Sequence, residues 1–249
     1  MIFSLSGTGN SLHLARAVAE ITGDEVRELG RVPEGTVDVS SMGTVGFVFP
    51  VWYYDMPERL KEIISGHFRF GRDQIVWAAM TYGTTPGNAC ARTVRFFESQ
   101  SVDLRFALGY RMPENYIMLF TAPGREEIER LQSEVPDHAR EIADELAVQD
   151  VLRPRTTVGG SLISFFAHPF YNVFRKTRKF RVTDRCTGCG TCAEICPAPA
   201  IEMRDGRPVW TEKRCLHCAA CINRCPVHAI EYGRGTVGKE RYVDPHSGY

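Results

Sequence analysis

The segment FSLSGTGNS, residues 3–11, joins an apolar, strand-like start to a short loop of hydroxyl side chains, glycines and one asparagine. A helical pattern begins near Ser11. The N–H groups and the positive dipole end at the start of a helix bind anions, so a loop of this composition suits a phosphate group. The candidate binding residues are Ser6, Gly7, Thr8, Gly9, Asn10 and Ser11.

Two common phosphate-binding loops do not match this segment. A P-loop requires a lysine after its second glycine, and no lysine lies near the loop. A dinucleotide-binding fingerprint requires a third glycine at position 12, which is Leu12. The remaining alternative is a monophosphate that is bound without a cation, by hydroxyl groups, the Asn10 side chain and backbone N–H groups.

Working outward, apolar runs alternate with amphipathic helical patterns over the first 148 residues. We expect strands at 2–5, 24–29, 44–51, 74–81 and 105–110, and helices at 11–21, 57–65 and 88–97. A last helical stretch at 125–148 should kink or split at Pro136. Near-continuous apolar strands separated by helices predict an α/β fold with a doubly wound, five-stranded parallel sheet.

Charge and composition divide the chain into two units. Residues 1–150 hold 14 Lys and Arg against 22 Asp and Glu, whereas residues 151–249 hold 16 against 8. Overall, 43% hydrophobic and 24% charged residues are typical of a globular protein. There is no apolar run of transmembrane length and no leader-like start, so we expect a cytoplasmic protein without a transmembrane segment.

Residues 151–180 form an apolar and basic segment between the two units. We expect a linker that packs against both domains. The alternative is a docking surface for a partner or a membrane face, because a basic, aromatic stretch could serve either.

An internal repeat governs the C-terminal unit. RCTGCGTCAEICPAPAIE, residues 185–202, and RCLHCAACINRCPVHAIE, residues 214–231, match with a period of 29 residues. Each contains the run C-x2-C-x2-C-x3-C-P, which is the bacterial ferredoxin signature. Eight of the nine cysteines belong to this repeat, and Cys90 is expected to be a core residue.

The spacing predicts that the fourth cysteine of each repeat ligates the cluster of the other repeat, because it lies on a following helical turn and points away. One cluster should bind Cys186, Cys189, Cys192 and Cys225, and the other Cys215, Cys218, Cys221 and Cys196. Two zinc sites are the competing interpretation, but zinc sites commonly use paired C-x2-C knuckles. Eight thiolates on two clusters also consume much of the basic excess, which argues against nucleic-acid binding.

These motifs resemble two known families. Residues 181–232 resemble a dicluster bacterial ferredoxin with every ligand position filled. His217 and His228 could tune its potentials, but we expect such residues to be exposed. The S-x-T-G-N-S loop resembles the FMN phosphate loop of flavodoxins, which implies two further flavin loops at 49–57 and 81–89. The residues implied there are Pro50, Val51, Trp52, Tyr53, Thr81, Tyr82 and Gly83.

Within these loops, only one or two of the adjacent Trp52, Tyr53 and Tyr54 can stack on a flavin, so Tyr53 and Tyr54 could instead pack under the loop. Asp55 could donate a proton near the flavin, but a turn or helix-capping role is the stronger expectation.

The order of the two resemblances is that of the fused flavodoxin–ferredoxin proteins of anaerobic bacteria and archaea. It implies an FMN domain at 1–150, a linker at 151–180, a small α+β 2[4Fe-4S] domain at 181–235 and a tail at 236–249. It further implies electron transfer between two [4Fe-4S] clusters and FMN, and on to partner redox proteins.

Two other functions remain open. The chain could be a flavin-dependent reductase that acts directly on a small substrate or a quinone. It could also be a redox sensor that uses its clusters as a switch, although nothing in the sequence specifically favours this.

Overall fold

The computed structural model of the chain describes residues 1–148, 171, 175–212 and 215–249. The N-terminal part contains a five-stranded, fully parallel sheet in the order β2-β1-β4-β6-β7. This 2-1-3-4-5 order is the flavodoxin-like arrangement and confirms the predicted fold class. The strands are β1 (Ile2–Ser4), β2 (Val26–Glu28), β4 (Thr44–Pro50), β6 (Ile75–Tyr82) and β7 (Leu104–Arg111).

The sheet is buried on both faces, which explains why its strands read as near-continuous apolar runs. Along β4, Phe47 and Phe49 belong to the core on one face, whereas Val48 between them belongs to the core on the other. Successive side chains of a strand point to opposite faces, so a strand covered on both sides needs apolar residues at every position. All three side chains are fully buried.

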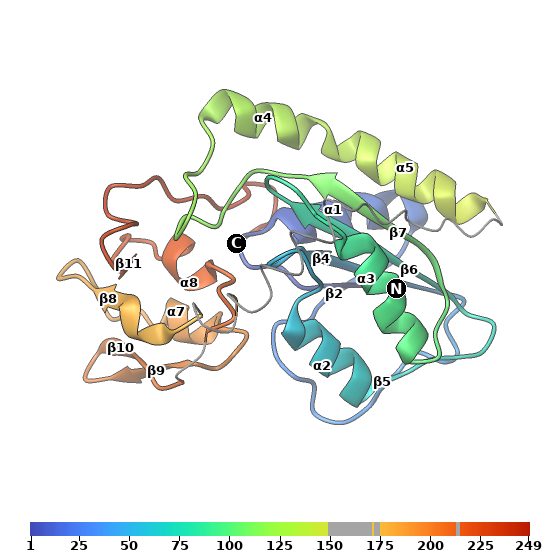
Figure 1. Cartoon of the computed structure of the whole chain (residues 1–249), viewed down its shortest axis with the longest axis horizontal. Coiled ribbons are helices and arrows are strands. Elements are labelled where there is room, and N and C mark those ends of the chain that lie inside the picture. Colours follow the sequence, from blue (N-terminus) through green and yellow to red (C-terminus); the bar gives the residue numbers. More distant parts are fainter. Residues whose placement is uncertain (149–170, 172–174, 213–214) are drawn as a thin grey trace.

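Helices cover each face, as Figure 1 shows. Helices α1 (Asn10–Thr22) and α5 (Val135–Ala147) pack together on one face, and α2 (Glu58–His67) and α3 (Ala89–Ser99) contribute to the core of the other. Helix α4 (Arg125–Ser133) ends just before α5 begins. Pro136 lies in the first turn of α5, where its missing N–H is tolerated, so the predicted split is confirmed. A small parallel pair, β3 (Val37–Asp38) with β5 (Phe68–Arg69), was not predicted.

The C-terminal part consists of two short antiparallel pairs and two short helices. Strand β8 (Phe180–Val182), which follows the 3-10 turn η1 (Thr177–Lys179), pairs with β11 (Ile230–Tyr232), and β9 (Ile201–Arg204) pairs with β10 (Arg207–Trp210). Helices α7 (Thr191–Glu194) and α8 (Ala220–Asn223) occupy equivalent places in the two repeats. This is the small α+β domain that the cysteine repeat predicts.

The two parts are packed against each other. Ile117, from the segment after β7, is fully buried in the C-terminal core with Phe180 and Ile222. The tail, residues 236–249, returns to the sheet, where the N–H of Asp244 donates to the Thr8 carbonyl at 2.8 Å. Figure 1 accordingly places the C-terminus between the two parts.

The domain limits at 150, 180 and 235 stay a prediction. Most of the expected linker lies outside the described residues. No helix within the described part of the chain has the length and apolar character that crossing a membrane requires.

Candidate functional site

A cavity of about 580 Å³ lies at the carboxyl edge of the sheet, where β4, β6 and β7 end. Open parallel sheets bind their ligands at this edge. The predicted flavin residues that line it are Asn10, Pro50, Val51, Trp52, Tyr53, Thr81, Tyr82 and Gly83. The segment after β7, from Pro113 to Phe120, contributes a further wall that the sequence did not reveal. Lys179, His217 and Tyr232 of the C-terminal part also line the cavity.

The predicted phosphate loop packs against residues of the cavity wall and contributes little to the lining itself. Of its residues only Asn10 lines the cavity, whereas Ser6, Gly7, Thr8, Gly9 and Ser11 do not. Two of its hydroxyl groups reach the cavity wall, because Ser11 Oγ lies 2.8 Å from Thr81 Oγ1 and Thr8 Oγ1 accepts from Asn115 Nδ2 at 2.5 Å. Ser6 Oγ accepts from the Gly9 N–H at 3.1 Å, which closes the loop on itself.

Two glycines of this loop permit close packing of other segments. A side chain at Gly7 would lie 2.5 Å from the Cys218 carbonyl oxygen, so the loop touches the second cysteine repeat. Gly9 has a φ of 108°, a left-handed conformation that L side chains rarely adopt, and it packs against Ser247 and Asp244 of the tail. The loop is therefore enclosed by both the ferredoxin-like part and the tail.

A tight turn carries the aromatic residues of the second flavin loop. The N–H of Trp52 donates to the Asp55 carbonyl at 3.0 Å, and the reverse bond is 3.1 Å. Tyr53 and Tyr54 inside the turn have φ values of 50° and 63°, which are strained for residues with side chains. Trp52, Tyr53 and Tyr54 all line the cavity.

Asp55 anchors this turn from below. Its buried carboxylate lies 2.5 Å from Arg92 Nη2 and 2.8 Å from Lys61 Nζ. Burial acts to raise the pKa of Asp55, but these two cations outweigh it and hold the pKa below its usual range. Asp55 is therefore ionised at neutral pH and fixes the turn. This agrees with the expectation from the sequence that Asp55 has a structural role in a turn.

Tyr53 belongs to a hydrogen-bonded group that joins the two parts of the chain. Its hydroxyl oxygen lies 2.6 Å from that of Tyr116, which in turn lies 2.8 Å from His217 Nδ1. His217 is only 4% exposed, so the expectation of an exposed histidine is wrong here, whereas His228 is exposed. Burial, together with the nearby charges of Arg175 and Lys179, lowers the pKa of His217 to about 4.

The eight repeat cysteines form two groups. Cys186, Cys189, Cys192 and Cys225 line one small cavity. In the other group, burial, together with the neighbouring charge of Cys196, raises the pKa of Cys215 to about 12. Burial and the charges of Cys215 and Cys196 likewise raise the pKa of Cys218. The fourth cysteine of each repeat thus lies beside the first three of the other repeat.

The backbone around these sulfur atoms repeats with the sequence. The N–H groups of Ala200 and Ala229, which are equivalent positions, donate to Cys196 Sγ at 3.4 Å and to Cys225 Sγ at 3.2 Å. Hydrogen bonds of this kind tune the potential of an iron–sulfur cluster. The left-handed conformations of Gly188 and Gly190 in the first repeat recur at His217 and Ala219 in the second.

The cysteine groups fit iron–sulfur clusters chemically. All eight are free thiols, and in the second group Cys221 is buried and the other three are half-buried, where a thiolate is costly unless a metal compensates its charge. Within the described residues, no three His, Cys, Asp or Glu side chains come close enough to hold a single metal ion. A cubane distributes four cysteines over four irons, so its ligands lie further apart than those of one ion. Cys90 lies away from both groups, beside the sheet core, where burial raises its pKa to about 11.

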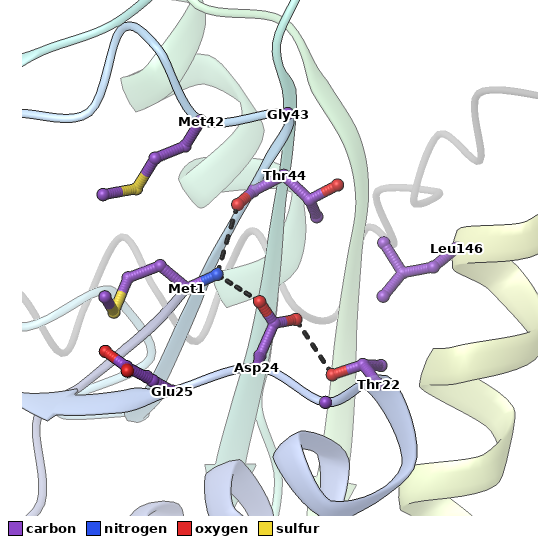
Figure 2. A pocket seen from close by; sticks show the side chains of 9 residues that line it. Met1, Thr22, Asp24, Glu25, Met42, Gly43, Thr44 and Leu146 are labelled. Atoms are coloured by element: carbon purple, nitrogen blue, oxygen red, sulfur yellow. Dashed lines mark hydrogen bonds and ion pairs between the residues drawn. The ribbon is translucent and has the colours of Figure 1, made fainter.

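A second cavity, of about 600 Å³, lies at the opposite, amino edge of the sheet. Figure 2 shows the Met1 amino group between the Asp24 carboxylate and the Thr44 carbonyl oxygen. The Thr22 hydroxyl also donates to Asp24, at 2.9 Å. The polar groups of Met1, Thr22 and Asp24 in this second cavity therefore bond to one another or to the backbone. None of the predicted site residues lines this cavity.

One family model matches the C-terminal part of the chain. Residues 178–241 match the family model of the 4Fe-4S dicluster domain. A search of the curated proteins gives no match.

Solved structures with a similar fold cover the N-terminal part. A flavodoxin from Streptococcus pneumoniae TIGR4 is 19% identical, with a TM-score of 0.34, and the match covers 56% of this chain and 97% of that one. The Trp repressor binding protein of Bacillus subtilis is 11% identical, with a TM-score of 0.33 and coverage of 55% and 96%. Rubredoxin oxygen:oxidoreductase from the anaerobe Desulfovibrio gigas is 17% identical, with a TM-score of 0.32; the match covers 59% of this chain but only 36% of that one.

Proposed function

We propose that this chain, in which a flavodoxin-like sheet is fused to a dicluster ferredoxin domain, is an electron-transfer protein that carries FMN and two [4Fe-4S] clusters. The sheet order and the family match support a redox function based on flavin and iron–sulfur chemistry. The specific role proposed is to pass electrons between the clusters and FMN, and on to a partner redox enzyme.

One observation carries this proposal: both parts of the chain build the wall of the same cavity. Trp52 and Tyr82 come from the flavodoxin-like sheet, whereas His217 comes from the second cysteine repeat, one residue before Cys218. A ligand in this cavity is therefore in contact with the loop that surrounds one cysteine group. Such proximity is what electron transfer within one polypeptide needs.

The residues proposed to hold FMN have separate tasks. The aromatic side chains of Trp52 and Tyr82 offer flat apolar surfaces for the ring, and the backbone of Thr81 and Gly83 offers polar groups beside them. The start of α1 supplies N–H groups for the phosphate, with Ser6 and the rest of its loop as their support. FMN would accept or release one or two electrons, and each cluster one.

The two cysteine groups are proposed to bind one cluster each, with crossed ligation. Burial differs between them, because Cys189 of the first group is exposed, whereas none of the four cysteines of the second group is exposed and Cys221 is buried. The first group is therefore the natural point of electron exchange with a partner protein. The second group lies between it and the flavin cavity in this scheme.

Direct reduction of a small substrate is the second candidate. It is favoured by two apolar side chains at the cavity, Leu119 and Phe120, which are 67% and 40% exposed. Such a surface could receive an apolar substrate such as a quinone.

Anaerobic purification followed by assays of iron, sulfide and flavin tests the proposal. We expect about eight irons, eight sulfides and one FMN per chain, and a reductive titration that bleaches both chromophores. Colourless protein, or zinc in place of iron, would contradict it. Fast turnover of NADH or NADPH with a quinone, without any partner protein, would instead support the reductase.

A further inference from the structure

Three side chains from distant parts of the sequence meet where the cavity touches the second cysteine repeat. Tyr53 comes from the loop after β4, Tyr116 from the segment after β7, and His217 from between Cys215 and Cys218. The two phenol oxygens are 2.6 Å apart, and Tyr116 Oη is 2.8 Å from His217 Nδ1. All three side chains line the cavity.

His217 connects this chain of hydrogen bonds to the cysteine group. The backbone N–H of His217 donates to Cys215 Sγ at 3.2 Å. The other ring nitrogen, Nε2, is buried and has no hydrogen-bond partner among the residues that the structure describes. An unpaired buried nitrogen of this kind is costly, and a cofactor bound at this site would relieve that cost.

The hydrogens of the three groups can be counted. Two neutral phenols and one neutral imidazole carry three polar hydrogens. Two short hydrogen bonds join the three groups, and Tyr53 Oη also lies 3.4 Å from His217 Nδ1, but this nitrogen cannot donate and accept at once, so only two of these bonds form together. One hydrogen is therefore left over. It sits at one end of the chain or the other: on Tyr53 Oη, at the cavity, or on His217 Nε2, beside the cysteine repeat.

The positions of Tyr53 and His217 are maintained at a conformational cost. Their φ values of 50° and 56° lie in the left-handed region, which costs about 1–3 kcal/mol for each such residue. The Tyr53 ring also packs on Tyr171, at 4.5 Å between ring centroids, so the group is held from both parts of the chain.

We propose that Tyr53, Tyr116 and His217 couple the flavin site to the cluster of the second repeat, so that an electron crosses between them there and a change at one site is felt at the other. This inference rests on the proposed function. The step is a single electron transfer: one cofactor is oxidised by one electron and the other is reduced by one. The electron transfer itself forms and breaks no covalent bond, and the three side chains keep their charge. The two orientations of the hydrogen-bonded chain differ in the His217 tautomer, so when the orientation reverses, the N–H bond at one ring nitrogen breaks, one at the other forms, and the two hydroxyls rotate. The direction of the hydrogen bonds decides which end carries the surplus hydrogen. On Tyr53 Oη it can donate to a ligand in the flavin cavity, and on His217 Nε2 it can donate toward the cluster of the second repeat.

Two pairs of variants test the coupling. His217→Asn removes the imidazole with a residue that tolerates a left-handed backbone, and His228→Asn is its matched control, because His228 has a φ of 48° but is exposed and does not line the cavity. Tyr53→Phe removes one hydroxyl, and Tyr110→Phe is its control, because Tyr110 belongs to the core of the sheet and does not line the cavity.

Each variant changes a residue near one cofactor site, and the measurement is made on the cofactor at the other site. We expect His217→Asn to change the flavin potential, and Tyr53→Phe to change the EPR spectrum of the second-repeat cluster. In partly reduced protein, the ratio of reduced cluster to reduced flavin should change about fivefold, because one hydrogen bond contributes about 1 kcal/mol. At 59 mV per tenfold change, this corresponds to a difference of about 40 mV between the two reduction potentials. The two control variants should match the wild-type protein in every measurement.

Iron, sulfide and flavin contents separate the possible failures. A wild-type protein that lacks flavin or clusters would overturn the proposed function itself. If all cofactors are present and each variant alters only its own site, or matches its control, the coupling alone is overturned. Should His217→Asn lose iron, Tyr53→Phe and Tyr116→Phe decide the question, because both lie outside the cysteine repeats.

Discussion

The turn that carries Trp52 should depend on the charge of Asp55. Asp55 is 5% exposed, and its partners Arg92 and Lys61 are 33% and 27% exposed. Removing one member of a fully buried ion pair costs about 3–5 kcal/mol, whereas exposed pairs contribute about 0–1 kcal/mol. Because these cations are partly hydrated, we expect Asp55→Asn to lower the free energy of unfolding by about 2 kcal/mol at neutral pH.

The pH dependence of stability follows from the lowered pKa of Asp55. A carboxyl group whose pKa is lower in the folded state stabilises the protein above its unfolded pKa, and this stabilisation is lost as the pH falls through the folded pKa. The wild-type protein should therefore lose stability below about pH 4, and the part due to Asp55 should be missing in Asp55→Asn.

Urea unfolding under anaerobic conditions, followed by tryptophan fluorescence at a series of pH values, measures both effects. Asp137→Asn is the control, because Asp137 is 75% exposed and pairs with Arg140 on the surface of α5. We expect that control to change stability by less than about 0.5 kcal/mol. The reasoning is refuted if Asp55→Asn is as stable as the control, or if it keeps the full acid dependence of the wild-type protein.

Three further predictions concern the cofactor loops. Ser6→Ala combined with Thr8→Ala should weaken FMN binding by up to about 30-fold, because each change removes an internal hydrogen bond of about 1 kcal/mol that shapes the loop behind the cavity, while iron content is unchanged; equilibrium dialysis and iron analysis check this. Cys196→Ala should damage the cluster of the second repeat rather than that of the first, and EPR spectra showing the reverse would contradict crossed ligation. Gly7→Ala would place a methyl group 2.5 Å from the Cys218 carbonyl oxygen, so it should destabilise the protein by about 1–3 kcal/mol and disturb flavin and cluster together; a loss of flavin alone would argue against this contact.

The sequence predicted most of the sheet because each of its elements is determined by local pattern. The apolar run of β4 is readable because both of its faces are buried, and the break between α4 and α5 is readable because of Pro136. The pair formed by β3 and β5 escaped prediction, since strands of two residues carry no periodicity.

The candidate site was predictable only where a motif carries it. The cysteine groups follow from spacing, and the proposed flavin loops were implied by the resemblance of the first loop to that of flavodoxins. Tyr116 and Asn115 lie in a segment without a motif, and their place in the cavity wall follows only from three-dimensional packing. The burial of His217 was missed for the same reason. Packing between the N-terminal and C-terminal parts of the chain produces no periodic pattern of apolar residues in the sequence of either part.

The tail also shows how little local pattern says about contacts between distant segments. Residues 236–249 have no strong apolar pattern, yet the Tyr242 hydroxyl donates to Asn10 Oδ1 at 2.7 Å, across most of the chain length. The N–H of Tyr242 in turn donates to Asn223 Oδ1 of the second repeat at 3.2 Å. One residue of the tail thereby joins the phosphate loop to the cysteine-rich part.

That closure of the loop by the tail has a consequence for biosynthesis. The ribosome completes the sheet and the glycine-containing loop long before it reaches Tyr242 and Asp244, so the nascent protein presents the predicted phosphate loop uncovered during translation. We expect a nucleotide cofactor to enter most rapidly in that interval, and to exchange slowly in the finished molecule.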